Sequence, residues 1–203
     1  TGIFPDLTRY QAEADQAQVN QGHQPWKSSA TQTAQAFGAS LLHWDPQAPA
    51  TLVSGGGSRD TQAVVNLRNA VPGGNEITLA MTRLEGNAND GIWIVTAVTS
   101  GGLSITQPQA ASIIHSSTTI TGTGSAFEGV IGQVTVLDHL YTNIGQATVH
   151  GAIGNGSTTF STQVTSQPTF TNGAQEGLVM LAEENNAGGG SAGAVIVKVL
   201  IQQ

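Results

Sequence analysis

The sequence contains no cysteine, and its charged side chains are scarce. Without cysteine the chain can form no disulfide framework and offers no thiolate to a metal ion. Aspartate, glutamate, lysine and arginine together make up 9% of the residues, against about a quarter in an average globular domain. Glycine, serine, threonine, glutamine and asparagine take their place. This composition is typical of secreted and cell-wall β proteins.

Basic residues are the scarcest charged class. Six lysines and arginines stand against 13 aspartates and glutamates, which gives a net charge of −7. A nucleic-acid surface needs clustered basic side chains that displace counterions from phosphates, and docking on anionic lipid needs them too. We therefore expect no nucleic-acid partner and no electrostatic attachment to a membrane.

Long apolar runs are also missing. No run reaches the roughly 18 residues that a membrane-spanning helix needs, so no membrane span is expected. The chain begins at Thr1 without a charged-then-apolar leader. We therefore expect an extracytoplasmic protein, either secreted or membrane-anchored, whose signal or anchor has been removed.

Two helical patterns open the chain. Residues 1–24 are rich in glutamine and alanine and predict a marginal helix or a linker, with Asp6 as its cap and Gly22 as its end. Its thin apolar stripe consists of Leu7, Tyr10, Ala14 and Ala17. A stronger helix follows, capped by Ser28 or Ser29 and ended by Pro46, with Trp26 packing on its first turns. Its apolar positions are Ala30, Ala34, Phe37, Leu41 and Trp44.

The period changes to strand-like alternation near residue 51. Strands are expected over 61–71, 76–84 and 91–99, joined by turns at 72–74 and 86–91. The Gly-Gly-Gly-Ser-Arg-Asp stretch at 55–60 lacks the lysine and helix start of a phosphate loop, so it predicts a hairpin loop. With the preceding helix, these strands predict a small α+β domain over 25–102.

The remaining residues predict strands alone. A glycine hinge at 100–102 precedes seven short strands separated by Gly, Asn and Pro turns, the pattern of a β-sandwich over 103–203. The expected strands are 103–106, 117–122, 129–137, 144–151, 158–166, 177–184 and 194–202. A flexible hairpin tip is expected at 185–192, and Asn155-Gly156-Ser157, although it matches a glycosylation acceptor, predicts a hairpin turn.

A Phe-Glu-Gly turn leads into the central strand of this half. We expect Phe127 to fill one end of the sandwich, Gly129 to allow the turn, and Val134 and Val136 to begin a core strand.

Motifs along residues 103–203 resemble the immunoglobulin-like domain of bacterial spore germination. They comprise Gln-Pro at 107–108, Ile-Thr-Gly-Thr-Gly at 120–124, Ala-Phe-Glu-Gly at 126–129, Val-Thr-Val-Leu-Asp at 134–138, Gly151, Phe160, Gly-Leu-Val at 177–179 and the apolar run 195–201. The chain departs from that family at 139–143, where the family has a short turn, and at 181–183, where an aromatic is missing. The resemblance implies an immunoglobulin-like fold and a non-enzymatic accessory module outside the cytoplasm.

The first half is similar to segments that precede this domain in secreted bacterial proteins of unassigned function. The similarity rests on Gly-His-Gln-Pro-Trp at 22–26, the helix at 37–44 and Gly-Ile-Trp-Ile-Val at 91–95. The expected fold class is therefore mainly β with an α+β N-terminal part: a helix-plus-antiparallel-meander domain followed by an immunoglobulin-like β-sandwich.

No set of residues predicts a reaction. Glu128 with Asp138, or with the acidic pair at 183–184, would need a separation of about 5–9 Å to act as glycosidase carboxylates. No Gly-x-Ser-x-Gly elbow occurs, and the histidines lack zinc-site spacing; they are His23, His43, His115, His139 and His150. We expect no catalytic residue, no cofactor and no metal site.

Three residues are the expected ligand or partner contacts: Tyr141, Phe170 and His139. Tyr141 and Phe170 are loop aromatics able to stack on a sugar or a protein surface, and His139 stands next to Asp138. The expected function is a non-enzymatic binding or assembly module that contacts an envelope protein or a cell-wall polymer and is associated with sporulation or germination. The alternative is a carbohydrate- or cell-wall-binding module of a hydrolase system.

Overall fold

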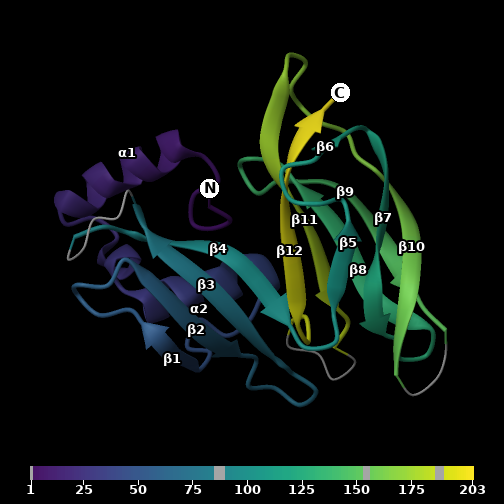
Figure 1. Cartoon of the computed structure of the whole chain (residues 1–203), viewed down its shortest axis with the longest axis horizontal. Helices are drawn as coiled ribbons and strands as arrows, with labels where there is room; N and C mark the ends of the chain where they lie inside the picture. The colour runs from purple at the N-terminus through teal and green to yellow at the C-terminus, as the bar shows by residue number, and fades with distance from the viewer. Residues whose placement is uncertain (1, 85–89, 153–155, 186–189) are drawn as a thin grey trace. The chain divides into compact units, whose positions relative to one another are not determined.

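A computed structural model describes residues 2–84, 90–152, 156–185 and 190–203 (Figure 1). The expected turn at 86–91 and hairpin tip at 185–192 lie partly outside these residues, and Asn155 lies wholly outside them. The protein is mainly β, with two α-helices near its N-terminus, which confirms the broad fold class. The chain divides into two compact units, the first over Thr1–Val98 with Ala187–Gly190 and the second over Thr99–Asn186 with Ser191–Gln203.

In the N-terminal unit the helices come first along the chain, and four strands of a sheet follow them. The helices are α1 (Arg9–Asn20), the 3-10 helix η1 (Pro25–Ser28) and α2 (Ala30–Leu42). The strands follow the order β1 (Ala50–Gly55), β2 (Gln62–Arg68), β3 (Glu76–Arg83) and β4 (Trp93–Ser100). The expected strands and the hairpin loop at 55–60 are confirmed. The strand β1 was not predicted, because its residues are mostly exposed and show no alternation.

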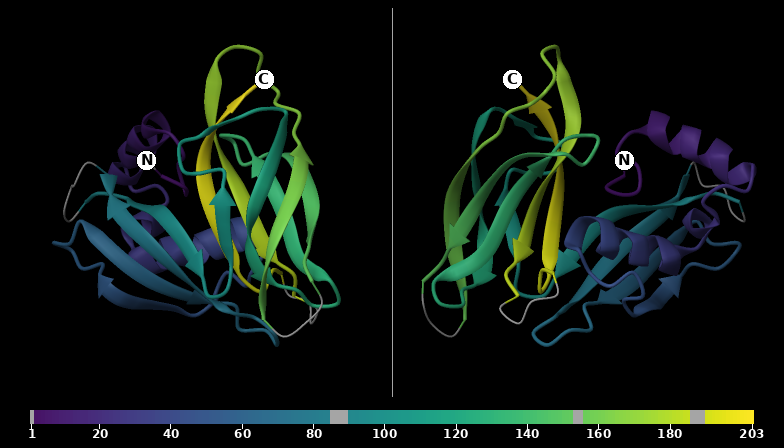
Figure 2. Two further views of the ribbon diagram at one scale, coloured as in Figure 1. Left: turned by 45° about the vertical axis from the view of Figure 1, so that its right-hand side comes forward. Right: turned by 180° about the vertical axis from the view of Figure 1, so that it is seen from behind.

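The helix α2 covers one face of this sheet (Figure 2). Ser29 is its N-cap, and the Ser29 hydroxyl accepts a hydrogen bond from the backbone N–H of Gln32 at 3.4 Å. The helix ends at Leu42, because His43 adopts a left-handed conformation with φ of 58°. Gly38 of α2 lies so close to β2 that a Cβ there would be 2.8 Å from the Leu67 side chain. The buried residues of β2 and β3 are Ala63, Val65, Leu67, Ile77, Leu79 and Met81. Trp26 lies in η1 and stacks on Phe4 with ring centroids 6.3 Å apart.

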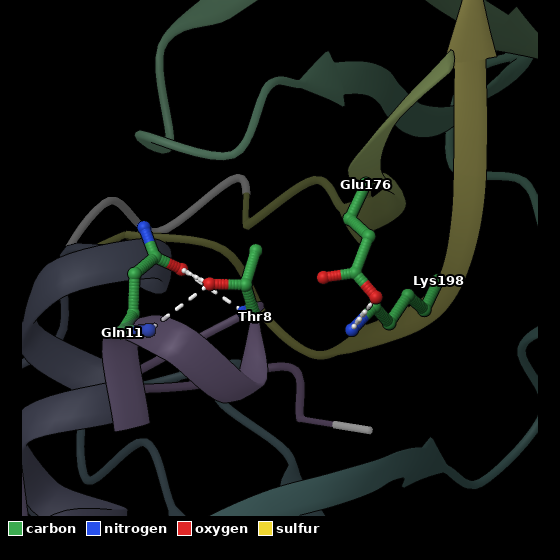
Figure 3. A network of polar contacts seen from close by, with 4 residues as sticks. All are labelled: Thr8, Gln11, Glu176 and Lys198. Atoms are coloured by element: carbon green, nitrogen blue, oxygen red, sulfur yellow. Dashed lines mark hydrogen bonds and ion pairs between the residues drawn. The ribbon is translucent and has the colours of Figure 1, made fainter. Parts of the chain in front are cut away.

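The helix α1 begins differently from the expectation. Its N-cap is Thr8, not Asp6: the Thr8 hydroxyl accepts from the Gln11 N–H at 3.1 Å, and Gln11 Oε1 accepts from the Thr8 N–H at 3.0 Å (Figure 3). Asp6 is instead buried. Tyr10, expected on the apolar stripe, is 82% exposed. Ala12 and the partly buried Val19 of α1 pack with the buried Ile92 and Ile94, so a thin stripe is enough to dock this helix.

The C-terminal unit contains two hydrogen-bonded sets of strands. The first set has the order β12 (Ala194–Gln202), β11 (Ala174–Glu183), β8 (Val130–Leu137) and β9 (Asn143–His150), with the short β6 (Ile113–Ile114) parallel to β12. The second set has the order β10 (Ser157–Thr165), β7 (Ser117–Ser125) and β5 (Ser104–Gln107). The seven expected strands are confirmed, and β6 was not predicted.

Both sets of strands supply side chains to one core. Ile120, Phe160 and Val164 come from the second set; Val134, Val136, Val179, Leu181 and Val199 come from the first. Val134 and Val136 are fully buried, as expected for a core strand. The transfer of so many branched apolar side chains out of water is the main favourable term in the folding of this unit.

The Phe-Glu-Gly turn has the predicted shape but the opposite side-chain placement. Glu128 and Gly129 both have positive φ, 51° and 86°, and Phe127 and Val130 exchange two backbone hydrogen bonds of 2.8 and 2.9 Å around them. This is the geometry of a two-residue hairpin turn, in which glycine is favoured at the second position. Phe127 is 58% exposed, so its expected role as a plug in the core is wrong.

Two phenylalanines of this unit should differ sharply on truncation. Phe160→Ala removes a ring that is 6% exposed in the core and should lower the free energy of unfolding by about 3–5 kcal/mol. Phe127→Ala should change it by less than about 0.5 kcal/mol. Urea unfolding of both variants measures the difference, and equal losses would contradict the exposed position of Phe127.

Candidate functional site

Two neighbouring loops of the C-terminal unit hold all three residues expected to contact a ligand or partner. We call the surface formed by residues 138–143 and 166–173 the loop end. The first segment leads from β8 to β9, and the second follows β10. The Gln167 N–H donates to the Ile144 carbonyl at 2.8 Å, which joins the second segment to β9 directly after the first segment. A Cβ at Gly145 would lie 2.5 Å from the Thr165 carbonyl oxygen, so this close approach requires glycine.

A buried carboxylate holds the first segment in one conformation. Asp138 is 3% exposed, and its Oδ1 accepts the backbone N–H groups of Leu140 at 2.8 Å and Thr142 at 2.9 Å. The Asp138 N–H donates to the Thr142 carbonyl, and the Tyr141 N–H donates to the Asp138 carbonyl, both at 3.0 Å. Hydrogen bonds from N–H groups to an ionised acceptor are stronger than neutral ones. These four hydrogen bonds therefore fold the loop back onto Asp138, its first residue.

The closed loop turns one large apolar side chain outward. Leu140 is 66% exposed, while the flanking His139 and Tyr141 are half-buried. Tyr141 has φ of 61°, a left-handed conformation that a non-glycine residue adopts only when its surroundings hold it there. The fixed backbone therefore sets the position of Leu140 before any partner arrives.

The structure places two of the expected contact residues in the same loop and the third in the second segment of the loop end. His139 and Tyr141 lie in the same closed loop. Phe170 lies in the second segment, half-buried and packed against the core of the unit. A ring that packs on the core offers less free surface for stacking than an exposed one. Their role as contacts stays a prediction.

Sequence reasoning missed Leu140 and the anchoring role of Asp138. The available signal was Asp138 itself, because aspartate at the end of a strand commonly accepts the N–H groups of the residues that follow it in a turn. Adjacent side chains point to opposite faces of a sheet only within a strand. The strand β8 ends at Leu137, so this rule does not apply to Asp138 and His139. The exposure of Leu140 has no signal in the sequence.

One of the two carboxylate pairs weighed as catalytic, Glu128 with Asp138, lies at opposite ends of a strand. Glu128 lies in the turn before β8 and Asp138 lies directly after it, and β8 itself has eight residues. At about 3.3 Å per residue their separation is roughly 30 Å, far beyond the reach of a glycosidase pair. Glu128 is exposed in its turn, and Asp138 is occupied with backbone N–H groups.

Other charged groups near this end of the unit are already paired. Lys198 of β12 forms an ion pair with Glu176 of β11, with Nζ and Oε1 3.0 Å apart (Figure 3). Within the described ranges no group of three or more His, Cys, Asp or Glu side chains is placed to hold a metal ion. Among the described residues no helix is long and apolar enough to cross a membrane.

Comparison with known proteins gives no family for this chain. No family model matches the sequence, and a search of curated proteins finds no match. The resemblance of residues 103–203 to the immunoglobulin-like domain of spore germination therefore stays a prediction.

Removal of the Asp138 carboxylate should loosen the first segment. Asp138→Ala leaves the Leu140 and Thr142 N–H groups without their acceptor and should lower the free energy of unfolding by about 1–3 kcal/mol. Amide hydrogen exchange should accelerate at Leu140 and Thr142. Asp45→Ala is a matched control, because Asp45 is exposed and accepts a single N–H, from Gln47 at 2.7 Å. Equal effects of the two substitutions would contradict the anchoring role.

Proposed function

We propose that this protein is a non-enzymatic binding or assembly module that works outside the cytoplasm in a bacterial cell envelope. Its C-terminal unit would be an immunoglobulin-like β-sandwich that contacts a partner protein through the loop end. The observation that carries the proposal is the rigid loop at 138–142, which exposes Leu140. The cellular location rests on the low content of charged residues.

Rigidity is the property that favours a binding role for this loop. A partner that meets a flexible loop must order it, which costs about 0.5–1.5 kcal/mol for each side chain immobilised. The Asp138 hydrogen bonds remove much of that cost before binding. A single exposed leucine is common on protein surfaces, but one held on an anchored loop beside a half-buried tyrosine is a preorganised contact. Loops on a rigid scaffold are where binding residues concentrate.

The chemistry of the loop end favours an uncharged partner surface. Between 138 and 143 the titratable side chains, tyrosine aside, are the buried Asp138 and the half-buried His139. Residues 166–173 contain no Asp, Glu, Lys, Arg or His. Thr142, Asn143, Gln167 and Asn172 are exposed and can exchange neutral hydrogen bonds. Contacts of this kind are little screened by ions. Binding should therefore depend only weakly on salt.

A partner protein is favoured over a cell-wall glycan. Sugar recognition relies on an exposed aromatic face, whereas Phe170 packs on the core and Tyr141 is half-buried. Leu140 offers the branched apolar surface that protein interfaces bury at their centre. The association with sporulation or germination rests on the family resemblance alone and belongs to the same proposal.

Substitution of Leu140 should weaken the contact without unfolding the protein. We expect Leu140→Asp to reduce affinity for the partner at least tenfold, a loss of about 1.4 kcal/mol or more. Phe127→Asp is a matched control, because Phe127 is also exposed and apolar but lies at the other end of β8. The partner is captured from solubilised envelopes, purified, and titrated with each variant at two salt concentrations, with thermal unfolding as the check on folding.

Two results would overturn this assignment. An affinity that survives Leu140→Asp but falls with Phe127→Asp would move the contact to the other end of the unit. Binding to purified cell-wall sacculi that is lost in Tyr141→Ala, with no protein partner captured, would favour the carbohydrate-binding alternative.

A further inference from the structure

The sheet of the N-terminal unit ends on an open edge. The strand β1 comes last in the strand order, and among the described residues its pairing partner is β2 (Figure 1). All its residues from Thr51 to Gly55 are exposed. An edge strand presents unpaired main-chain N–H and C=O groups, to which another extended chain can add. The outer edge of β1 is therefore an interaction surface made of backbone.

The register of β1 on β2 decides which of its backbone groups face outward. The Arg68 N–H donates to the Pro49 carbonyl at 3.0 Å, and Thr51 lies two residues further along β1. Antiparallel strands alternate between hydrogen-bonded and non-hydrogen-bonded residue pairs. Thr51 therefore bonds to β2, whereas its neighbours Ala50 and Leu52 do not. The N–H and C=O groups of Ala50 and Leu52 point away from β2, onto the open edge.

The edge lacks the charges that normally prevent strand addition. Natural edge strands often carry lysine, proline or an inward-pointing charge that stops another chain from pairing. No Asp, Glu, Lys or Arg occurs between Asp45 and Arg59, and β1 itself contains no proline. The β-bulge between Leu52 and Ser54 disturbs the ladder only beyond both outward-facing residues. Although the net charge of −7 opposes self-association, no charged side chain lies on this strand.

The Leu52 side chain leaves the edge accessible. A Cβ at Gly56 would collide with the Leu52 side chain, so this side chain rests on the glycine loop that follows β1. The outward N–H and C=O of Leu52 can therefore be approached along the edge.

The two outward-facing residues are complementary to themselves. When two copies of β1 run antiparallel about a two-fold axis at Thr51, Ala50 of each copy lies opposite Leu52 of the other. Each of these two pairs exchanges two hydrogen bonds. The resulting four bonds use every outward N–H and C=O of Ala50 and Leu52 in both copies. This match favours a second copy of the chain as the strand that adds to the edge.

We propose that two copies of this protein associate through β1, which pairs antiparallel with its counterpart about a two-fold axis at Thr51. The interface is isologous, because the same strand serves both copies. Its specificity comes from the register of the main-chain hydrogen bonds. It lies in the N-terminal unit and is independent of the contact proposed at the loop end. A dimer carries two loop ends, and linked sites of this kind bind a clustered partner more tightly.

Single-cysteine cross-linking of the whole chain tests the register, because the sequence has no cysteine of its own. In the proposed register Thr51 lies opposite itself as a non-hydrogen-bonded pair, with Cα atoms about 4.5 Å apart, within the span of a disulfide. Thr51→Cys should therefore form a covalent dimer rapidly under mild oxidation. Val53→Cys is the matched control. Val53 is exposed on the same strand, but four residues at about 3.3 Å each would separate the two cysteines by about 13 Å.

Sedimentation equilibrium of the wild-type chain and of Leu52→Pro tests the main-chain pairing. We expect wild type to dimerise reversibly as its concentration rises, and Leu52→Pro to dimerise at least about tenfold more weakly, because two of the four hydrogen bonds lose their donor. Proline is tolerated on an edge strand where the N–H faces solvent, so β1 should stay paired with β2. Val53→Ser removes an exposed apolar side chain but no outward backbone group and should dimerise like wild type. Circular dichroism checks that each variant is folded.

Several results would overturn the proposal. They are a wild-type chain that stays monomeric at every concentration, equal cross-linking of Thr51→Cys and Val53→Cys, and a folded Leu52→Pro that dimerises as well as wild type. A dimer lost in Val53→Ser but kept in Leu52→Pro would replace strand pairing with an apolar side-chain contact and would also contradict it. The cross-linking comparison decides the question even where Leu52→Pro fails to fold.

Discussion

Burying a carboxylate costs free energy, and the two units of this protein meet that cost in different ways. Asp138 and Asp6 are both almost fully buried, and a buried charge is tolerated only when other groups replace the water it has lost. Asp138 receives two backbone N–H groups and a closed turn in return. Asp6 Oδ2 receives no hydrogen bond among the described residues, and the charge of Lys27 opposes its desolvation. The aspartate of the C-terminal unit therefore fixes a loop through hydrogen bonds, whereas the aspartate of the N-terminal unit has a nearby cation.

The buried carboxylate of the C-terminal unit supports a surface that can bind a partner. That unit has a single core to which both sets of strands contribute, and its loop end offers a fixed, nearly uncharged surface. Such a surface suits a protein contact that depends on shape and apolar area.

The sequence predicted local structure well and non-local placement poorly. Alternation gave the strands of both units, and Ser29 gave the start of α2, because these signals come from neighbouring residues. Asp6 was assigned as a helix cap because aspartate and threonine are both good caps, and Gln11 decides between them by completing a capping box with Thr8. Phe127 was placed in the core on its hydrophobicity, although the turn it enters leaves it exposed. Ala12 and Val19 of α1 pack with Ile92 and Ile94, and no spacing along the chain reports such an approach.

Nitrogen-15 NMR relaxation across residues 138–142 is the most direct test of the claim that Asp138 fixes this loop before any partner binds. The backbone order parameters of Leu140 and Tyr141 are expected to match those of β8 and β9, at about 0.85, because the Asp138 carboxylate accepts two N–H groups of the loop. Order parameters below about 0.6, the range of a flexible backbone, would contradict the claim.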